Sequence, residues 1–449
     1  MSTLVIILIV CLAVVIVLWL MFGINWRSNR NYEWKHHLLQ AKMQAEDSEE
    51  LQRLLFSGSL TMCVEQRFRP LAMLLSQNRR PSVSTSETEI IISGRRKYDL
   101  LIRDLINARE SIHMEYFHFG IDKSSRRIRR LLMRKAQQGV KVRFINENIA
   151  NFPIPSIYFL SMRRAGVEVV NFSNTRFSLL RFLMTLSYRD HRKIVVIDNR
   201  IGYTGGMNIN DHYFYQWRDT HLRLTGEAVV SLQYAFLDTW LAAGGRLQDS
   251  INSFFHLSDD PFCGSYKGTL TQITPDDPTS PEPVLQTAYE WILNHAQHYV
   301  WIQSPYLAPP DSLMQAFRNA VKRGVEVAVM VPERCDTGVV RPINRSFYHD
   351  FVQAGVKLYV RTGEFNHSKT IVADDYLTMI GTTNLDNRSF GIDYEIDTFF
   401  YDEPMALHNK AIFEKELQQC RLLNKEELDN DSWLNKLFCR TMRVLAPII

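Results

Sequence analysis

Apolar and polar positions along this chain predict strands and helices in alternation. Short apolar runs rich in β-branched residues indicate strands, and longer stretches with apolar residues every three or four positions indicate helices. Early in the chain the expected strands are 89–93, 111–117, 140–145 and 167–170, with helices at 98–108 and 123–138. The same order of strands and helices is repeated further along the chain, with strands at 269–274, 299–304, 325–331 and 356–360 and helices at 282–298 and 311–322. This alternation predicts an α/β fold of two similar halves with mainly parallel sheets.

The N-terminal stretch follows a different pattern, because residues 4–24 contain no charged side chain. Such a run is long enough to span a bilayer as a helix. A basic leader and a small-residue cleavage site are both absent, which favours a retained anchor over a cleaved signal peptide. Basic residues follow the run and none precedes it, so the positive-inside rule places the remainder in the cytoplasm. We expect a single-pass membrane protein.

The expected organisation after this transmembrane helix has three parts. Residues 25–88 form a juxtamembrane helical region and linker, residues 89–251 the first half, and residues 265–449 the second half with a C-terminal amphipathic segment. Residues 172–188 are extra relative to the second half. Their apolar character suits an interfacial element or a core helix, and their place beside the motif described below favours the interfacial element. For residues 433–449 an interfacial helix and a helix packed on the core are equally expected.

Composition changes this picture only slightly. The 449 residues carry a formal charge of +4, a mild basic excess that suits an anionic surface. The six cysteines show no metal-binding spacing and indicate free thiols in a reducing compartment.

One motif occurs twice, at His191–Asn208 and His367–Asn384. Aligned from the histidine, the copies share lysine, aspartate, glycine and asparagine at the same offsets. The matched pairs are Lys193 and Lys369, Asp198 and Asp374, Gly205 and Gly381, and Asn208 and Asn384. An acid follows at a further matched offset, as Asp219 in one copy and Glu395 in the other. This repetition indicates a duplicated functional unit.

The paired motifs suit transfer at a phosphodiester. One histidine can attack phosphorus while the other protonates the leaving alcohol, and lysine and asparagine side chains can hold the phosphoryl oxygens. Asp219 and Glu395 can fix the imidazole tautomers. Asp198 and Asp374 complete the candidate catalytic motifs, although their place at a turn favours a structural role. No metal or other cofactor is expected, because the lysines supply the positive charge.

The doubled motif resembles the phospholipase D superfamily. Three further stretches are similar to bacterial cardiolipin synthases: 217–222 (WRDTHL), 303–306 (QSPY) and 384–390 (NLDNRSF). The resemblance implies two phospholipase D-like halves packed about a pseudo-two-fold axis, with both histidines in one site and a phosphohistidine intermediate. It favours His191 as the nucleophile, although the repeat itself is symmetric. It also suggests a polar site role for Glu115.

The reaction implied by the resemblance joins two phosphatidylglycerol molecules into cardiolipin and glycerol at the bacterial inner (cell) membrane. A phospholipase D hydrolase and a phosphatidylserine synthase of the same superfamily are the alternatives. The expected anchor and the lack of a basic groove interleaved with aromatic residues argue against a nucleic-acid partner. The oligomeric state stays open.

Overall fold

The computed structural model describes residues 38–46, 48–78, 80–172, 188–255 and 268–448. The expected transmembrane helix at 4–24 and nearly all of the extra segment, residues 173–187, lie outside this range. Within it, no helix is both long and apolar enough to cross a bilayer.

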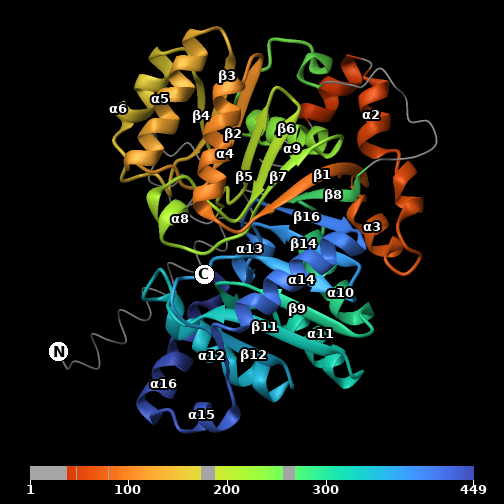
Figure 1. The fold of residues 1–449 in the computed structure, drawn as a ribbon, viewed down its shortest axis with the longest axis vertical. Helices are drawn as coiled ribbons and strands as arrows, with labels where there is room; N and C mark the ends of the chain where they lie inside the picture. The colour runs from red at the N-terminus through yellow and green to blue at the C-terminus, as the bar shows by residue number, and fades with distance from the viewer. Residues whose placement is uncertain (1–37, 47, 79, 173–187, 256–267, 449) are drawn as a thin grey trace, which may run out of the picture.

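A single sheet of fifteen strands runs through both halves (Figure 1). A second sheet pairs only β10 (Leu307–Ala308) with β15 (Leu385–Asp386). The large sheet contains, in spatial order, β17 (Cys420–Leu422), β12 (Lys357–Arg361), β11 (Glu326–Pro332), β9 (Tyr299–Gln303), β13 (Thr370–Ala373), β14 (Leu377–Gly381), β16 (Glu395–Tyr401), β8 (Thr269–Asp276), β1 (Ser84–Ile91), β7 (His221–Thr225), β6 (Ile201–Gly205), β5 (Lys193–Ile197), β2 (Ser111–Tyr116), β3 (Lys141–Glu147) and β4 (Glu168–Phe172).

Counted outward from the centre, corresponding strands of the two halves follow in the same order, and only β17 at one edge has no counterpart among the described strands. The centre is the antiparallel pairing of β1 with β8, where Ser84–Ser86 face Thr269–Thr271. β1 begins at Ser84, within the stretch expected to be linker, because its serine and threonine side chains are buried at this seam. The prediction of two similar α/β halves is confirmed.

The expectation of a mainly parallel sheet is wrong. Among the described strands of the large sheet, parallel pairing is confined to β2–β3–β4 and β9–β11–β12. The other neighbours, including both motif hairpins, are antiparallel. Parallel neighbours need a long crossover connection, whereas the two strands of each motif are joined by a short turn, residues 198–200 or 374–376, that allows only antiparallel pairing.

Helices cover both faces of the sheet in matching positions. In the first half α4 (Gly94–Asn107), α5 (Lys123–Gln137) and α6 (Ser156–Arg164) pack on one face, and α9 (Ala228–Ala242) packs on the other. Their counterparts are α10 (Val284–His295), α11 (Asp311–Lys322), α12 (Val340–Gln353) and α14 (Glu403–Leu417). Further helices are α2 (Glu49–Phe56), η1 (Ser59–Cys63), α3 (Arg69–Leu75), α8 (Asp211–Tyr215), η2 (Ile251–Phe254), α13 (Asn387–Gly391), α15 (Lys425–Asp429), α16 (Trp433–Met442) and η3 (Arg443–Ile448), and residues 38–45 are also helical.

Candidate active site

Each motif folds as a strand, a tight turn and a second strand. Two successive residues of each turn have a positive φ: 51° and 53° at Asp198 and Asn199, and 50° and 54° at Asp374 and Asp375. Aspartate and asparagine tolerate this left-handed conformation better than other non-glycine residues. The turn signal seen in the sequence therefore has a backbone cause.

Asp198 and Asp374 anchor these turns to the sheet. Each carboxylate accepts three backbone N–H hydrogen bonds of 2.8–3.0 Å, from Arg109, Glu110 and Ser111 before and at the start of β2, and from Gln297, His298 and Tyr299 before and at the start of β9. Among the described residues, no hydrogen bond or ion pair joins either carboxylate to a motif histidine or lysine. Their contacts are with the backbone and support a structural role, and a catalytic role for either aspartate stays a prediction.

Short backbone bridges hold each histidine against the opposite half. The His191 N–H donates to the Tyr394 carbonyl at 3.0 Å, and the Tyr394 N–H donates to the Arg189 carbonyl at 2.8 Å. The equivalent bridge joins His367 and Arg218 at 2.8 Å and is closed by the Arg218 N–H on the Phe365 carbonyl. Each histidine thus lies beside the acid that follows its bridging partner.

The resulting histidine–acid pairs cross between the halves. His191 Nδ1 lies 2.9 Å from Glu395 Oε1, and His367 Nδ1 lies 2.9 Å from Asp219 Oδ2. Both acids are fully buried. With Nδ1 engaged, the outer Nε2 of each ring is the atom available to a reacting group. The sequence predicted the acids, and the structure shows which histidine each one contacts.

Both motif lysines are buried beside the histidines. Lys193 Nζ donates to the His191 carbonyl at 2.5 Å, and Lys369 Nζ lies 2.9 Å and 3.0 Å from the two ring nitrogens of His367. Burial lowers the pKa of Lys193 to about 7 and that of Lys369 to about 8. An anion bound between them would favour their charged forms and raise both pKa values again.

The charges around the two histidines affect their pKa values differently. Burial and the positive charge of Lys193 and Lys369 lower the pKa of His191 well below its usual value. Burial and Lys369 also lower the pKa of His367, but Asp219 opposes that shift both by its charge and by its hydrogen bond. His367 is therefore the better placed of the two to carry a proton.

The glycine and asparagine positions shape the loops around the acids. A Cβ at Gly206 would lie 2.2 Å from Asp219 Oδ1, so this position must be glycine for the acid to fit. Asn208 accepts the His118 N–H at 3.2 Å and donates to the Tyr213 hydroxyl at 3.0 Å. Asn384 donates to the Ser389 hydroxyl at 3.3 Å, and its Oδ1 is buried without a partner.

Glu115 belongs to a buried acid pair that the sequence reading did not identify in full. Its carboxyl lies against that of Asp190, the residue before His191, and burial together with this neighbour raises the pKa of Glu115 well above its usual value. Burial raises the pKa of Asp190 to about 7. The matching positions in the second half hold amides, with Asn366 donating to Gln303 at 3.3 Å. The polar residue preceding each motif histidine was the available signal.

This pair predicts a pH dependence of stability. A carboxyl whose pKa is raised in the folded state binds more protons there than in the unfolded chain, so stability falls as pH rises from about 4 to about 7. Glu115→Gln combined with Asp190→Asn would reproduce the amide pair and remove the part of the slope that this pair contributes, while other buried carboxyls such as Glu395 and Asp397 keep theirs. We expect the variant to gain roughly 1–3 kcal/mol at pH 8 relative to the parent, measured by chemical unfolding between pH 4 and pH 8. An unchanged slope would contradict the raised pKa values of this pair.

A buried triad, also unforeseen, supports the bridge beside His367. Glu416 of α14 pairs with Arg218 of the first half at 2.8 Å and with Arg361 at 2.5 Å. Breaking such a buried network leaves an uncompensated charge. The cross-half contact at Arg218 is therefore fixed by side chains as well as by backbone.

The surroundings of the two histidines differ. Four rings lie 5.4–6.2 Å from His367, centre to centre: Tyr213, Trp217, Tyr306 and Phe365. His191 has Phe117 at 5.0 Å, and the charge of Arg388 acts on it. More aromatic rings surround His367 than His191, which the symmetric motif did not predict.

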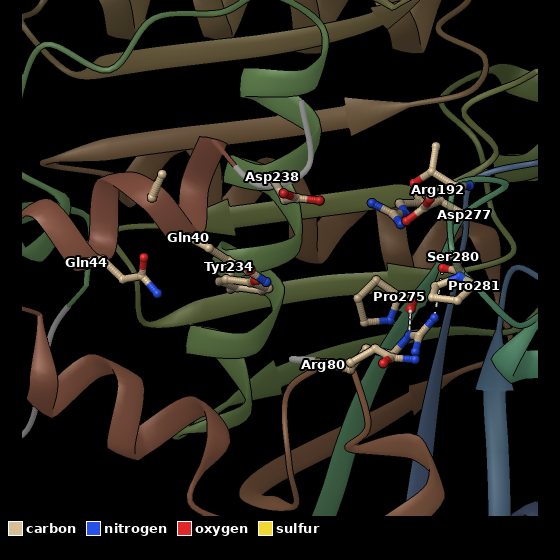
Figure 2. A pocket seen from close by; sticks show the side chains of 13 residues that line it. Gln40, Gln44, Arg80, Arg192, Tyr234, Asp238, Pro275, Asp277, Ser280 and Pro281 are labelled. Carbon is tan, nitrogen blue, oxygen red and sulfur yellow. Dashed lines mark hydrogen bonds between the residues drawn. The ribbon is translucent and has the colours of Figure 1, made fainter. Parts of the chain in front are cut away.

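A cavity of about 670 Å³ lies behind this site (Figure 2). Arg192, between His191 and Lys193 in sequence, reaches its wall and donates to the Asp276 carbonyl at 2.9 Å. Arg80 closes the same wall through Asp276 and Ser280. Neither motif histidine lines the cavity.

Comparisons with known proteins agree with this arrangement. A sequence profile of the phospholipase D-like domain of cardiolipin synthases matches residues 101–240 and 290–417. The chain is 32% identical to a cardiolipin synthase of Alkalihalophilus pseudofirmus, covering 96% of this chain and 85% of the relative. It is 30% identical to the major cardiolipin synthase of Bacillus subtilis, covering 96% and 90%.

Solved structures show the same fold at lower identity. A phosphatidylserine synthase of Haemophilus influenzae superimposes with a TM-score of 0.65 at 15% identity, over 86% of this chain and all of that one. A polyphosphate kinase of Porphyromonas gingivalis gives 0.52 at 13% identity, over 80% of this chain and 53% of the kinase.

Proposed function

The chain belongs to the cardiolipin synthase family of phospholipase D-like enzymes, and we propose that it joins two phosphatidylglycerol molecules into cardiolipin and glycerol. The observation that carries this is the crossed pairing of His191 with Glu395 and of His367 with Asp219. It gives one site two oriented imidazoles and two lysines, the groups that phosphodiester exchange needs.

In the proposed first step, Nε2 of His191 attacks the phosphorus of one phosphatidylglycerol. A P–N bond forms, the P–O bond to the headgroup glycerol breaks, and His367 donates its proton to the departing oxygen. His191 takes the nucleophilic role because its neutral form is favoured more strongly, and His367 takes the acid role because Asp219 stabilises its charge. Lys193 and Lys369 hold the non-bridging oxygens.

In the second step, a headgroup hydroxyl of another phosphatidylglycerol attacks the phosphatidyl-histidine. His367, now neutral, accepts the hydroxyl proton, the P–N bond breaks, and cardiolipin leaves. Both enzyme groups return to their starting states, so the cycle needs no external proton source and no metal. The aromatic rings around His367 limit the water that competes with the lipid alcohol.

The attachment to the bilayer is also part of this proposal. The uncharged run at 4–24, followed by basic residues, supports a single span with the catalytic halves on the cytoplasmic side of a bacterial inner membrane. Tethering would keep the site at the surface where both lipid substrates reside.

A direct test supplies the purified full chain in detergent with phosphatidylglycerol alone. We expect cardiolipin and glycerol in equal amounts, measured by mass spectrometry and an enzymatic glycerol assay. Phosphatidic acid as the main product would show that the enzyme is a hydrolase and not a transferase. Turnover appearing only after addition of a CDP-linked lipid and serine would replace it by a phosphatidylserine synthase.

A further inference from the structure

Helix α16 presents an apolar face that the rest of the described structure leaves uncovered. Trp433, Leu434, Leu437 and Phe438 are 70%, 61%, 55% and 54% exposed. At 100° per residue these four positions fall within an arc of about 140°. Cys439, the buried residue of this helix, points the opposite way. The helix therefore packs through a narrow polar and sulfur-bearing side and turns its large apolar side chains outward.

Polar contacts fix this orientation. Asp431, just before the helix, pairs with Arg345 of α12 at 2.6 Å. Arg443, just after it, pairs with Asp350 of α12 at 2.6 Å and lies 4.0 Å above the Phe347 ring. Both ends of the helix are thus tied to the second half. A loosely attached helix could turn its apolar face inward, whereas this one is held outward.

The charges on the helix itself have one sign, whereas the segment before it carries Glu426, Glu427, Asp429 and Asp431. From Trp433 to the C-terminus the sequence holds three basic residues, Lys436, Arg440 and Arg443, and no acidic one. Lys436 and Arg440 are exposed and lie along one border of the apolar arc. Apolar side chains flanked by cations match the interface of an anionic bilayer, where the former enter the acyl boundary and the latter contact headgroups.

The face is also connected to the active site. η3 continues from α16 and packs against α13, the helix that follows Asn384 of the second motif and carries Arg388. Figure 1 shows α16 beside α12 in the second half. An element inserted into lipid here would hold the second motif close to the lipid surface.

We propose that the α16 face docks on an anionic lipid bilayer and seats the site against the membrane. This inference rests on the proposed function for its lipid substrate, and it assigns to residues 433–442 a role separate from the chemistry. Of the two equal expectations for the C-terminal segment, it favours the interfacial helix.

The test reconstitutes the full chain into phosphatidylglycerol vesicles and compares it with the chain in detergent acting on dispersed short-chain phosphatidylglycerol. Leu434→Asp combined with Phe438→Asp should slow cardiolipin formation in vesicles at least about tenfold and leave the detergent rate unchanged. Met73→Asp on α3, which replaces a methionine that is 57% exposed, is the matched control and should change neither rate.

A second readout does not depend on turnover. Acyl-brominated phosphatidylglycerol should quench Trp433, measured as the difference between the parent and Trp433→Phe. No quenching difference, or equal rate losses in vesicles and detergent, would overturn the proposal. A detergent-solubilised dimer that the double substitution converts to a monomer would instead assign the face to a second copy of the chain. If the parent makes no cardiolipin, the proposed function fails while quenching still reports docking.

Discussion

His191→Ala and His367→Ala are each expected to lower cardiolipin formation by about ten-thousandfold or more. Each removes a ring that no neighbouring group can replace, since its Nδ1 is committed to an acid of the other half and its Nε2 is the reacting atom. The measurement is initial rate in detergent with phosphatidylglycerol, using protein whose fold is checked by circular dichroism and thermal unfolding. His408→Ala, an exposed histidine on α14, is the control and should retain full rate.

The two histidine variants should differ once the leaving group no longer needs a proton. With a nitrophenyl phosphodiester as donor, His367→Ala should still release nitrophenol in a single burst, because His191 can attack without an acid. His191→Ala should release none. Bursts of equal size in both variants, or substantial cardiolipin formation in either, would refute the assigned roles.

Asp219→Asn and Glu395→Gln are expected to lower turnover by roughly 10²- to 10⁴-fold, because an amide keeps the shape of the acid but cannot stabilise an imidazolium. The crossed pairing makes the prediction specific. Glu395→Gln should lower the pKa of His191 and leave that of His367 unchanged. Asp219→Asn should lower the pKa of His367 and leave that of His191 unchanged. Histidine titrations followed by NMR, assigned with the two alanine variants, would measure both shifts.

Glu403→Gln, an exposed acid in the first turn of α14, provides the matched control and should alter neither titration nor turnover. If Asp219→Asn moved the titration of His191 instead, the acids would act within their own halves. That result would contradict the two backbone bridges at Tyr394 and Arg218.

Local chemistry could be predicted from the sequence because it repeats. The hairpins, the shared face of each histidine and lysine, and the following acids all lie within thirty residues of a motif start. Which acid meets which histidine could not be predicted, since it depends on bridges between residues far apart in the sequence, 205 positions for Arg189 and Tyr394 and 149 for Arg218 and His367. Sheet direction failed for a related reason: strand spacing suggested crossovers, and only the short turns beyond each histidine reveal the antiparallel pairing.

The chemical differences between the two halves do not follow from the repeated motif. Positions with the same residue in both halves identify His191 and His367. Positions with different residues make the two sides of the site unlike. Asp190 faces Glu115 where Asn366 faces Gln303, and Trp217 stands where the second half has Asp393. A comparison of the residues that differ at matching positions would have indicated both the buried acid pair and the aromatic ring near His367.

The exchange of acids between halves has a consequence for biosynthesis. While the ribosome is still making the second half, His191 has no carboxylate and Asp219 has no imidazole to orient. A nascent chain would therefore be unable to cleave the lipids that it meets. Glu395 lies so late in translation that reactivity begins only when nearly the whole polypeptide has emerged.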